Sequence, residues 1–189
     1  MYKIESYLVL PHEEILQLGS CTGSIYETYP EKCFVNIEQE TDMLNLLKKP
    51  MYGEDKFNSL VTIKYNDTFL IGYKAWGMKV WSSYINMIFY YLTEGNSKAM
   101  FGVNPTVLEM KPLGSHKSSI SLRFDEVNDN KVIYTFTAND EEIIIALLNS
   151  ANHYINKMQE YGFNIQTESM KFKIDKSFDI IHTRGVSQN

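Results

Sequence analysis

The sequence predicts an α+β fold, with an antiparallel or mixed β-sheet and two long amphipathic helices packed on one face. Three observations predict this class: short β-rich segments, two long segments with helical periodicity, and an irregular succession of the two kinds. Because strands and helices do not alternate regularly, we do not expect a doubly wound parallel sheet. A chain of 189 residues fits one domain, which we place at residues 1–176, with a loose C-terminal tail at residues 177–189.

The first fifty residues contain short elements with clear breaks between them. Pro11 and Pro50 each end an element, because proline lacks the backbone N–H that strands and helices use. Thr41 is a suitable N-cap for the helix that follows it. In chain order we expect a strand at Tyr2–Leu10, a helical turn at His12–Leu18, a loop at Gly19–Ser24, a strand at Lys32–Glu38 and a helix at Thr41–Lys49.

The first long helix is expected at Trp76–Thr93. Gly95 lies just beyond its end, where a left-handed residue is best tolerated. If Trp76 instead precedes the helix, it can pack as a hydrophobic staple against Val80 or Trp81. Tyr90 and Tyr91 make the apolar stripe wider than a core needs, which indicates a second contact surface. The apolar positions with helical spacing are Val80, Trp81, Tyr84, Ile85, Ile88, Phe89 and Leu92.

Five further segments are rich in residues with high β-propensity. Two turn sequences, Asn66-Asp67 and Asn128–Asn130, separate neighbouring segments. In Ser118–Phe124, Ile120, Leu122 and Phe124 alternate with Ser121 and Arg123. One face of this segment should therefore be buried and the other solvated. We expect strands at Asn58–Tyr65, Thr68–Lys74, Thr106–Met110, Ser118–Phe124 and Val132–Thr137.

The second long helix is expected at Asp140–Tyr161. Asn139 is a natural N-cap, and Glu142 completes a pattern that resembles a capping box. Gly162 closes the helix. After it, Met170, Phe172 and Ile174 alternate with lysines, which predicts a last strand at Phe163–Ile174.

The charge is uneven along the chain and narrows the class of partner. The net charge is −5, and residues 1–60 hold five Lys against ten Asp or Glu, a balance of −5 by themselves. Residues 61–120 carry +3 and the remainder −3. Because phosphate binding requires clustered Lys and Arg, we do not expect nucleic acid as a partner.

The cellular location is predicted from cysteines and hydropathy. The spacing of Cys21 and Cys33 matches no zinc or redox motif, so free thiols in a reducing cytoplasm are expected. The N-terminus lacks the apolar region of a signal peptide, and no run of about 18 apolar residues predicts a membrane span. We therefore expect a cytoplasmic protein that does not bind membranes, as a monomer or a homodimer.

No sequence pattern predicts catalysis, a metal site or a cofactor. The histidines His12, His116, His153 and His182 are far apart and form no metal-binding motif. Neither a nucleophile elbow nor a glycine-rich phosphate loop is present. Cys21 lies between two glycines, but nothing positions a base beside it, as a catalytic thiol would require.

The acidic N-terminal region predicts a docking surface for a basic protein, because complementary charge speeds association. The abundant tyrosines also suit protein interfaces. From charge alone, the expected contact residues are Glu27, Glu31, Glu38, Glu40, Asp42, Glu54 and Asp55.

The order of elements also resembles a protein family. Thr68–Gly72, the helix from Trp76 to Leu92, Asn104–Leu108 and Asn139–Phe163 together resemble small immunity proteins of bacterial polymorphic and contact-dependent toxin systems. The resemblance implies tight one-to-one binding of a cognate toxin domain. Many toxin domains of such systems are nucleases with basic clefts. It supplies no site residues.

These observations favour a non-enzymatic protein-binding module, most specifically an immunity protein that neutralises a basic toxin domain. Two alternatives remain open at this point. One is an enzyme or small-ligand-binding protein whose site is assembled from distant residues. The other is a phage-encoded inhibitor or a structural subunit of a larger assembly.

Overall fold

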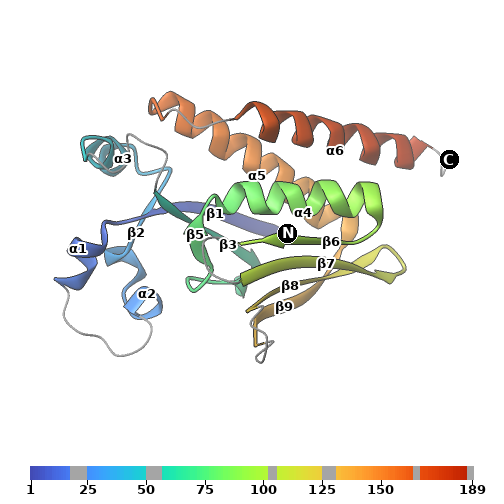
Figure 1. Ribbon diagram of the computed structural model, residues 1–189, viewed down its shortest axis with the longest axis horizontal. Helices are drawn as coiled ribbons and strands as arrows, with labels where there is room; N and C mark the ends of the chain where they lie inside the picture. The colour runs from blue at the N-terminus through green and yellow to red at the C-terminus, as the bar shows by residue number, and fades with distance from the viewer. Residues whose placement is uncertain (18–24, 50–56, 102–105, 125–130, 164–166, 187–189) are drawn as a thin grey trace. The chain divides into compact units, whose positions relative to one another are not determined.

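The computed structural model describes residues 1–17, 25–49, 57–101, 106–124, 131–163 and 167–186 (Figure 1). Within these ranges the chain forms two antiparallel sheets, six α-helices and one 3-10 helix. The predicted α+β class is confirmed. The chain divides into two compact units: unit 1 comprises Met1–Val80 and Tyr154–Ile165, and unit 2 comprises Trp81–His153 and Gln166–Asn189.

Unit 1 is built on a sheet in the order β2-β1-β3-β4, with β5 also paired to β3. Every pairing is antiparallel. The predicted hairpin is confirmed, since Asn66 and Asp67 have φ of 46° and 65° between β3 and β4, as such a turn requires. The strands are β1 (Tyr2–Val9), β2 (Phe34–Asn36), β3 (Asn58–Tyr65), β4 (Thr68–Ile71) and β5 (Trp76–Met78).

The two faces of this sheet differ in chemistry. Leu8, Val61 and Ile63 project from one face and are completely buried in the core. Glu5 and Lys64 lie on the other face, where they form an ion pair. The helical segments of unit 1 are α1 (His12–Leu16), α2 (Ile25–Thr28), the 3-10 helix η1 (Pro30–Lys32) and α3 (Glu40–Leu47).

Two predicted helix starts are wrong. The helix α3 begins at Glu40, and its N-cap is Gln39, so Thr41 does not cap it. The helix α4 (Val80–Glu94) begins four residues after Trp76, which belongs to β5 instead. Lys79 has φ of 54°, and this left-handed conformation interrupts the backbone between the strand and the helix.

Unit 2 contains the second sheet, in the order β6-β7-β8-β9. The predicted alternation is confirmed: Ile120 and Leu122 are buried, whereas Ser121 and Arg123 are partly exposed. The first strand of this sheet was not expected from the sequence. The strands are β6 (Ser97–Met100), β7 (Thr106–Gly114), β8 (Lys117–Phe124) and β9 (Val132–Asn139).

The helix α4 packs on this sheet (Figure 1). The Ser83 hydroxyl donates a hydrogen bond to the Met100 carbonyl at 2.8 Å, and the Tyr84 and Phe101 rings lie edge to face. The expected second contact surface at Tyr90 and Tyr91 is only half present. Tyr90 is exposed, but Tyr91 is buried and its hydroxyl donates to the Asp140 carboxylate at 2.9 Å.

The helix α5 (Asp140–Glu160) begins with the predicted cap. The backbone N–H of Glu142 donates to the Asn139 side-chain oxygen at 3.1 Å. Three acidic residues occupy the first turn, where they complement the helix dipole. Gly162, with φ of 81°, follows the helix in the left-handed conformation expected of a terminating residue.

Removal of this cap should have a measurable cost. We expect Asn139→Ala to lower the free energy of unfolding by about 1 kcal/mol, because one backbone donor of α5 loses its partner. Urea denaturation followed by circular dichroism measures the change. Asn139→Asp, which retains a capping oxygen, should stay within about 0.5 kcal/mol of the wild type. Equal losses in both variants would contradict a capping role.

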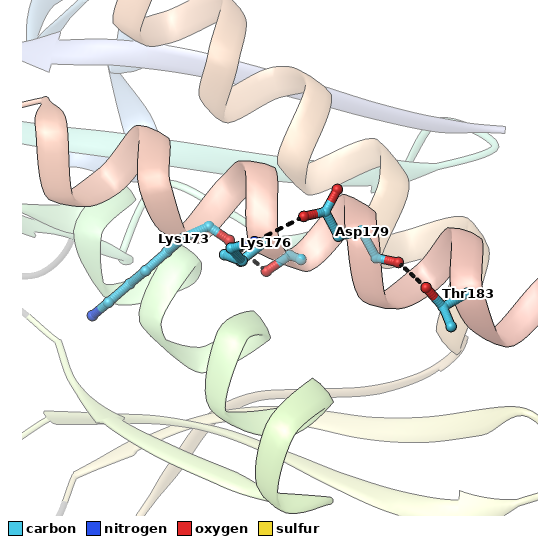
Figure 2. Close-up of polar contacts among 5 residues, drawn as sticks. Lys173, Lys176, Asp179 and Thr183 are labelled. Carbon is cyan, nitrogen blue, oxygen red and sulfur yellow. Dashed lines mark hydrogen bonds and ion pairs between the residues drawn. The ribbon is translucent and has the colours of Figure 1, made fainter.

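The predicted last strand, Phe163–Ile174, is wrong because most of this segment is helical. The helix α6 (Glu168–Val186) also includes residues 177–186 of the expected loose tail. Ile174, Ser177 and Ile181 are buried at helical spacing. Figure 2 shows contacts at the same spacing, in which Lys176 pairs with Asp179 and the Thr183 hydroxyl donates to the Asp179 carbonyl.

Within unit 2, α6 also contacts α4. The Lys173 ammonium donates to the Asn86 side-chain oxygen at 2.6 Å. The same ammonium lies 5.3 Å from the centre of the Tyr90 ring, a cation–π distance. Figure 2 shows the long Lys173 side chain extended away from the axis of its own helix.

Candidate protein-binding surface

Six aromatic side chains of unit 1 form a continuous group, which we call the aromatic cluster. Tyr26 of α2 connects Trp76 of β5, at a centroid distance of 4.8 Å, with Phe34 of β2, at 5.7 Å. Phe34 in turn stacks on Tyr73 at 5.6 Å. Such ring pairs stabilise their arrangement by about 0.5–1.5 kcal/mol beyond the area they bury. The members are Tyr7, Tyr26, Phe34, Phe69, Tyr73 and Trp76.

The cluster is only partly covered. Phe34 is buried and Phe69 is 41% exposed, while the other four rings are intermediate. Burial, followed by the proximity of Tyr73 and Glu5, raises the pKa of Tyr7 well above its ordinary value. Burial also raises the pKa of Tyr26. Both phenols therefore stay neutral at physiological pH, and the Tyr7 hydroxyl is hydrogen-bonded within the protein to Tyr73.

A groove of about 280 Å³ lies between η1, β2 and α3, and we call it the acidic groove. Phe34 belongs to both the groove and the aromatic cluster, so the two features are contiguous. Four apolar side chains line the groove together with five polar or charged ones. The lining residues are Leu10, Glu31, Phe34, Val35, Gln39, Asp42, Asn45, Leu46 and Lys49.

Short local elements position the two carboxylates of the groove. Pro30 opens η1 and places Glu31 in its first turn, while Asp42 lies in the first turn of α3. Both side chains are exposed. Within the described ranges neither carboxylate has a hydrogen-bond or ion-pair partner, whereas Lys49 pairs with Glu14. The groove therefore offers two negative charges that no described residue pairs with.

The structure brings together only some of the predicted contact residues. Glu31 and Asp42 share the groove. Glu27 instead pairs with Lys74 at 2.9 Å. Glu54 and Asp55 lie outside the described residues.

Glu38 and Glu40 belong to a different acidic group, around the end of α5. Burial, and after it the charges of Glu40, Glu38 and Glu160, raise the pKa of Tyr161 against the opposing effect of Lys157. The Tyr161 hydroxyl donates to the Ile37 carbonyl at 2.8 Å, which fixes the ring in this group. Sequence reasoning missed Glu160 because it lies more than a hundred residues from the acidic N-terminal region.

A second depression, of about 450 Å³, lies on the open face of the sheet in unit 2. Its central carboxylate, Glu109, is 2.9 Å from the Lys111 ammonium and 3.9 Å from the Arg123 guanidinium. These charges already neutralise one another in part. This face therefore attracts a charged partner less strongly than the acidic groove does. Ser119, Ser121, Val132 and Thr135 complete its lining.

The described ranges contain no group of three or more His, Cys, Asp or Glu that could hold a metal ion. His12, His116 and His153 are exposed, and Cys33 is buried, with its thiol donating to the Ile25 carbonyl at 3.9 Å. Cys21 lies outside the described residues. No helix in the part of the chain that the structure describes is long and apolar enough to cross a membrane.

Comparison with known proteins found no matching family, no matching curated protein and no matching solved structure.

Proposed function

We propose that the chain is a non-enzymatic protein-binding module, and most specifically a cytoplasmic immunity protein that neutralises a basic toxin domain. The observation that carries the proposal is the contiguity of the aromatic cluster and the acidic groove through Phe34. The binding surface consists of these two features.

The composition of this surface supports protein recognition. Tyrosine and tryptophan are enriched at interface centres, where they supply large contact area at low entropy cost. The free carboxylates of Glu31 and Asp42 lie on elements beside these rings. Tyr29, directly before η1, is 41% exposed and adds an aromatic ring to the same stretch of chain.

The charge of the surface selects the kind of partner. Exposed carboxylates attract a basic surface over roughly 8 Å at physiological salt and raise the rate of productive encounter. A nuclease toxin presents such a surface, because its cleft must bind phosphates. An inhibitor that covers the cleft with carboxylates needs no catalytic group of its own.

Charge reversal at the groove tests this proposal. The tagged protein is used to capture partners from its native strain at low and high salt, and the captured domain is co-expressed with each variant to score protection. We expect a basic partner whose affinity falls about 10- to 100-fold with Glu31→Lys and Asp42→Lys combined, since two attractive contacts become repulsive. Protection of the cells should fall in parallel.

The matched control reverses two exposed carboxylates of unit 2, as Glu94→Lys and Asp175→Lys. This pair makes the same change in net charge at residues that do not line the groove and should keep affinity within about threefold of the wild type. The electrostatic mechanism would be refuted if the affinity of the captured partner changes neither with salt concentration nor with the charge-reversal variants. The immunity role would be refuted if no partner is captured. It would also be refuted if the captured partner is an enzyme that acts on the same substrate as this chain.

A further inference from the structure

We propose that the acidic groove binds one arginine side chain of the partner as an anchor. The inference rests on the proposed function and deepens it, because it assigns the chemistry of the central contact. It follows from three properties of the groove: an apolar lining, two free carboxylates, and polar neighbours whose acceptor atoms are already engaged.

The apolar lining fits the stem of a long side chain. Phe34, Val35 and Leu46 are 4%, 8% and 2% exposed and form the covered part of the groove. The three methylene groups of an arginine would lie against them, and removing these groups from water favours binding. A volume of about 280 Å³ accommodates one such side chain.

The polar lining selects a cation. Glu31 and Asp42 are the lining carboxylates, and neither has a partner in the described ranges. Lys49 is the only cation among the lining residues that the structure describes, and it is held by Glu14. A positively charged group that entered between Glu31 and Asp42 would therefore meet two acceptors that nothing else in the described chain occupies.

The amides of the groove contribute fewer free acceptors. The Gln39 side-chain oxygen accepts the Asn36 backbone N–H at 3.0 Å, and the Asn45 side-chain oxygen accepts the Lys48 ammonium at 3.3 Å. These bonds occupy the side-chain oxygens of both amides. The carboxylates are thus the strongest acceptors open to a ligand.

Arginine fits this arrangement better than lysine does. Its guanidinium presents five donors in a plane, so it can bond two carboxylates on different elements at once. The guanidinium is also more weakly hydrated than an ammonium, so it loses less hydration free energy when it enters a partly apolar groove. Lysine carries the same charge on a compact, strongly hydrated group.

The test is a titration of the isotope-labelled full chain with the blocked tripeptide Gly-Arg-Gly, followed by NMR. We expect saturable shifts at Val35 and Leu46, with a dissociation constant on the order of millimolar. Glu31→Gln with Asp42→Asn should weaken binding at least tenfold. Asn45→Phe, which narrows the groove and leaves its charge unchanged, should do the same.

Three comparisons decide the outcome. Glu94→Gln with Asp175→Asn removes the same charge elsewhere and should leave the affinity unchanged. Gly-norleucine-Gly and Gly-Lys-Gly should each bind at least threefold more weakly than the arginine peptide. Equal binding by either peptide, shifts that never saturate up to about 20 mM, or full binding by Asn45→Phe would overturn the proposal.

These results separate the groove from the wider function. If the tripeptide binds as expected and no basic partner is captured, the arginine site stands and the immunity role fails. If a partner is captured and Asn45→Phe alters neither its binding nor that of the tripeptide, the role stands and the anchor fails.

Discussion

Trp81→Ala is expected to lower the free energy of unfolding by about 3–5 kcal/mol, because it removes a large ring from a closely packed interior. Trp81 is 2% exposed in α4, and its ring centre lies 5.8 Å from that of Tyr84, which is completely buried. Few atoms can move into the space that the ring leaves, so the loss includes a cavity term. Urea denaturation monitored by far-ultraviolet circular dichroism measures it without relying on tryptophan fluorescence.

A control on the same helix separates burial from helix propensity. Tyr90 is 39% exposed, so Tyr90→Ala should cost less than about 1 kcal/mol, including its cation–π contact with Lys173. If Trp81→Ala does not fold, Trp81→Phe preserves a ring and should show a smaller, measurable loss. A Trp81→Phe protein as stable as the wild type, or equal losses for Trp81→Ala and Tyr90→Ala, would contradict the burial of this ring.

The burial of α4 could be predicted from sequence because helical periodicity is a local property. Val80, Trp81 and Ile85 recur at the spacing of one helix face, and all three are buried. The start of the helix could not be predicted in the same way. Trp76 has high β-propensity, but its assignment depends on its pairing with Leu60, sixteen residues earlier in the chain.

The error at the C-terminus has a similar cause. Met170, Phe172 and Ile174 alternate with lysines, and over five residues this pattern fits a strand. In the helix the three residues differ in environment, with Phe172 58% exposed and Ile174 completely buried. The helical pattern becomes visible only when Ser177, a small polar residue in a buried position, is counted with the apolar ones.

The candidate site was predictable in its charge and not in its geometry. Composition indicated acidic residues between positions 27 and 55, but their distances in space depend on how η1, β2 and α3 meet. Glu31 and Asp42 share a groove, while Glu38 and Glu40, around the start of α3, act electrostatically on Tyr161, which follows α5. The aromatic cluster likewise gathers rings from four strands, one turn and one short helix, and no periodicity links them.

Asp175→Pro is expected to lower the free energy of unfolding by about 3 kcal/mol or more and to reduce the helical circular dichroism signal. Position 175 lies in the interior of α6, where proline removes a backbone hydrogen bond and its ring clashes with the carbonyl of Lys171. Asp175 itself is exposed, so Asp175→Ala should change stability by no more than about 0.5 kcal/mol. Asp175→Gly, at about 1 kcal/mol, provides an intermediate value if the proline variant does not fold. A strand that ended at Ile174 before a loose tail would accept proline at position 175 with little cost. A proline variant as stable as the alanine variant would therefore show that α6 does not exist in solution.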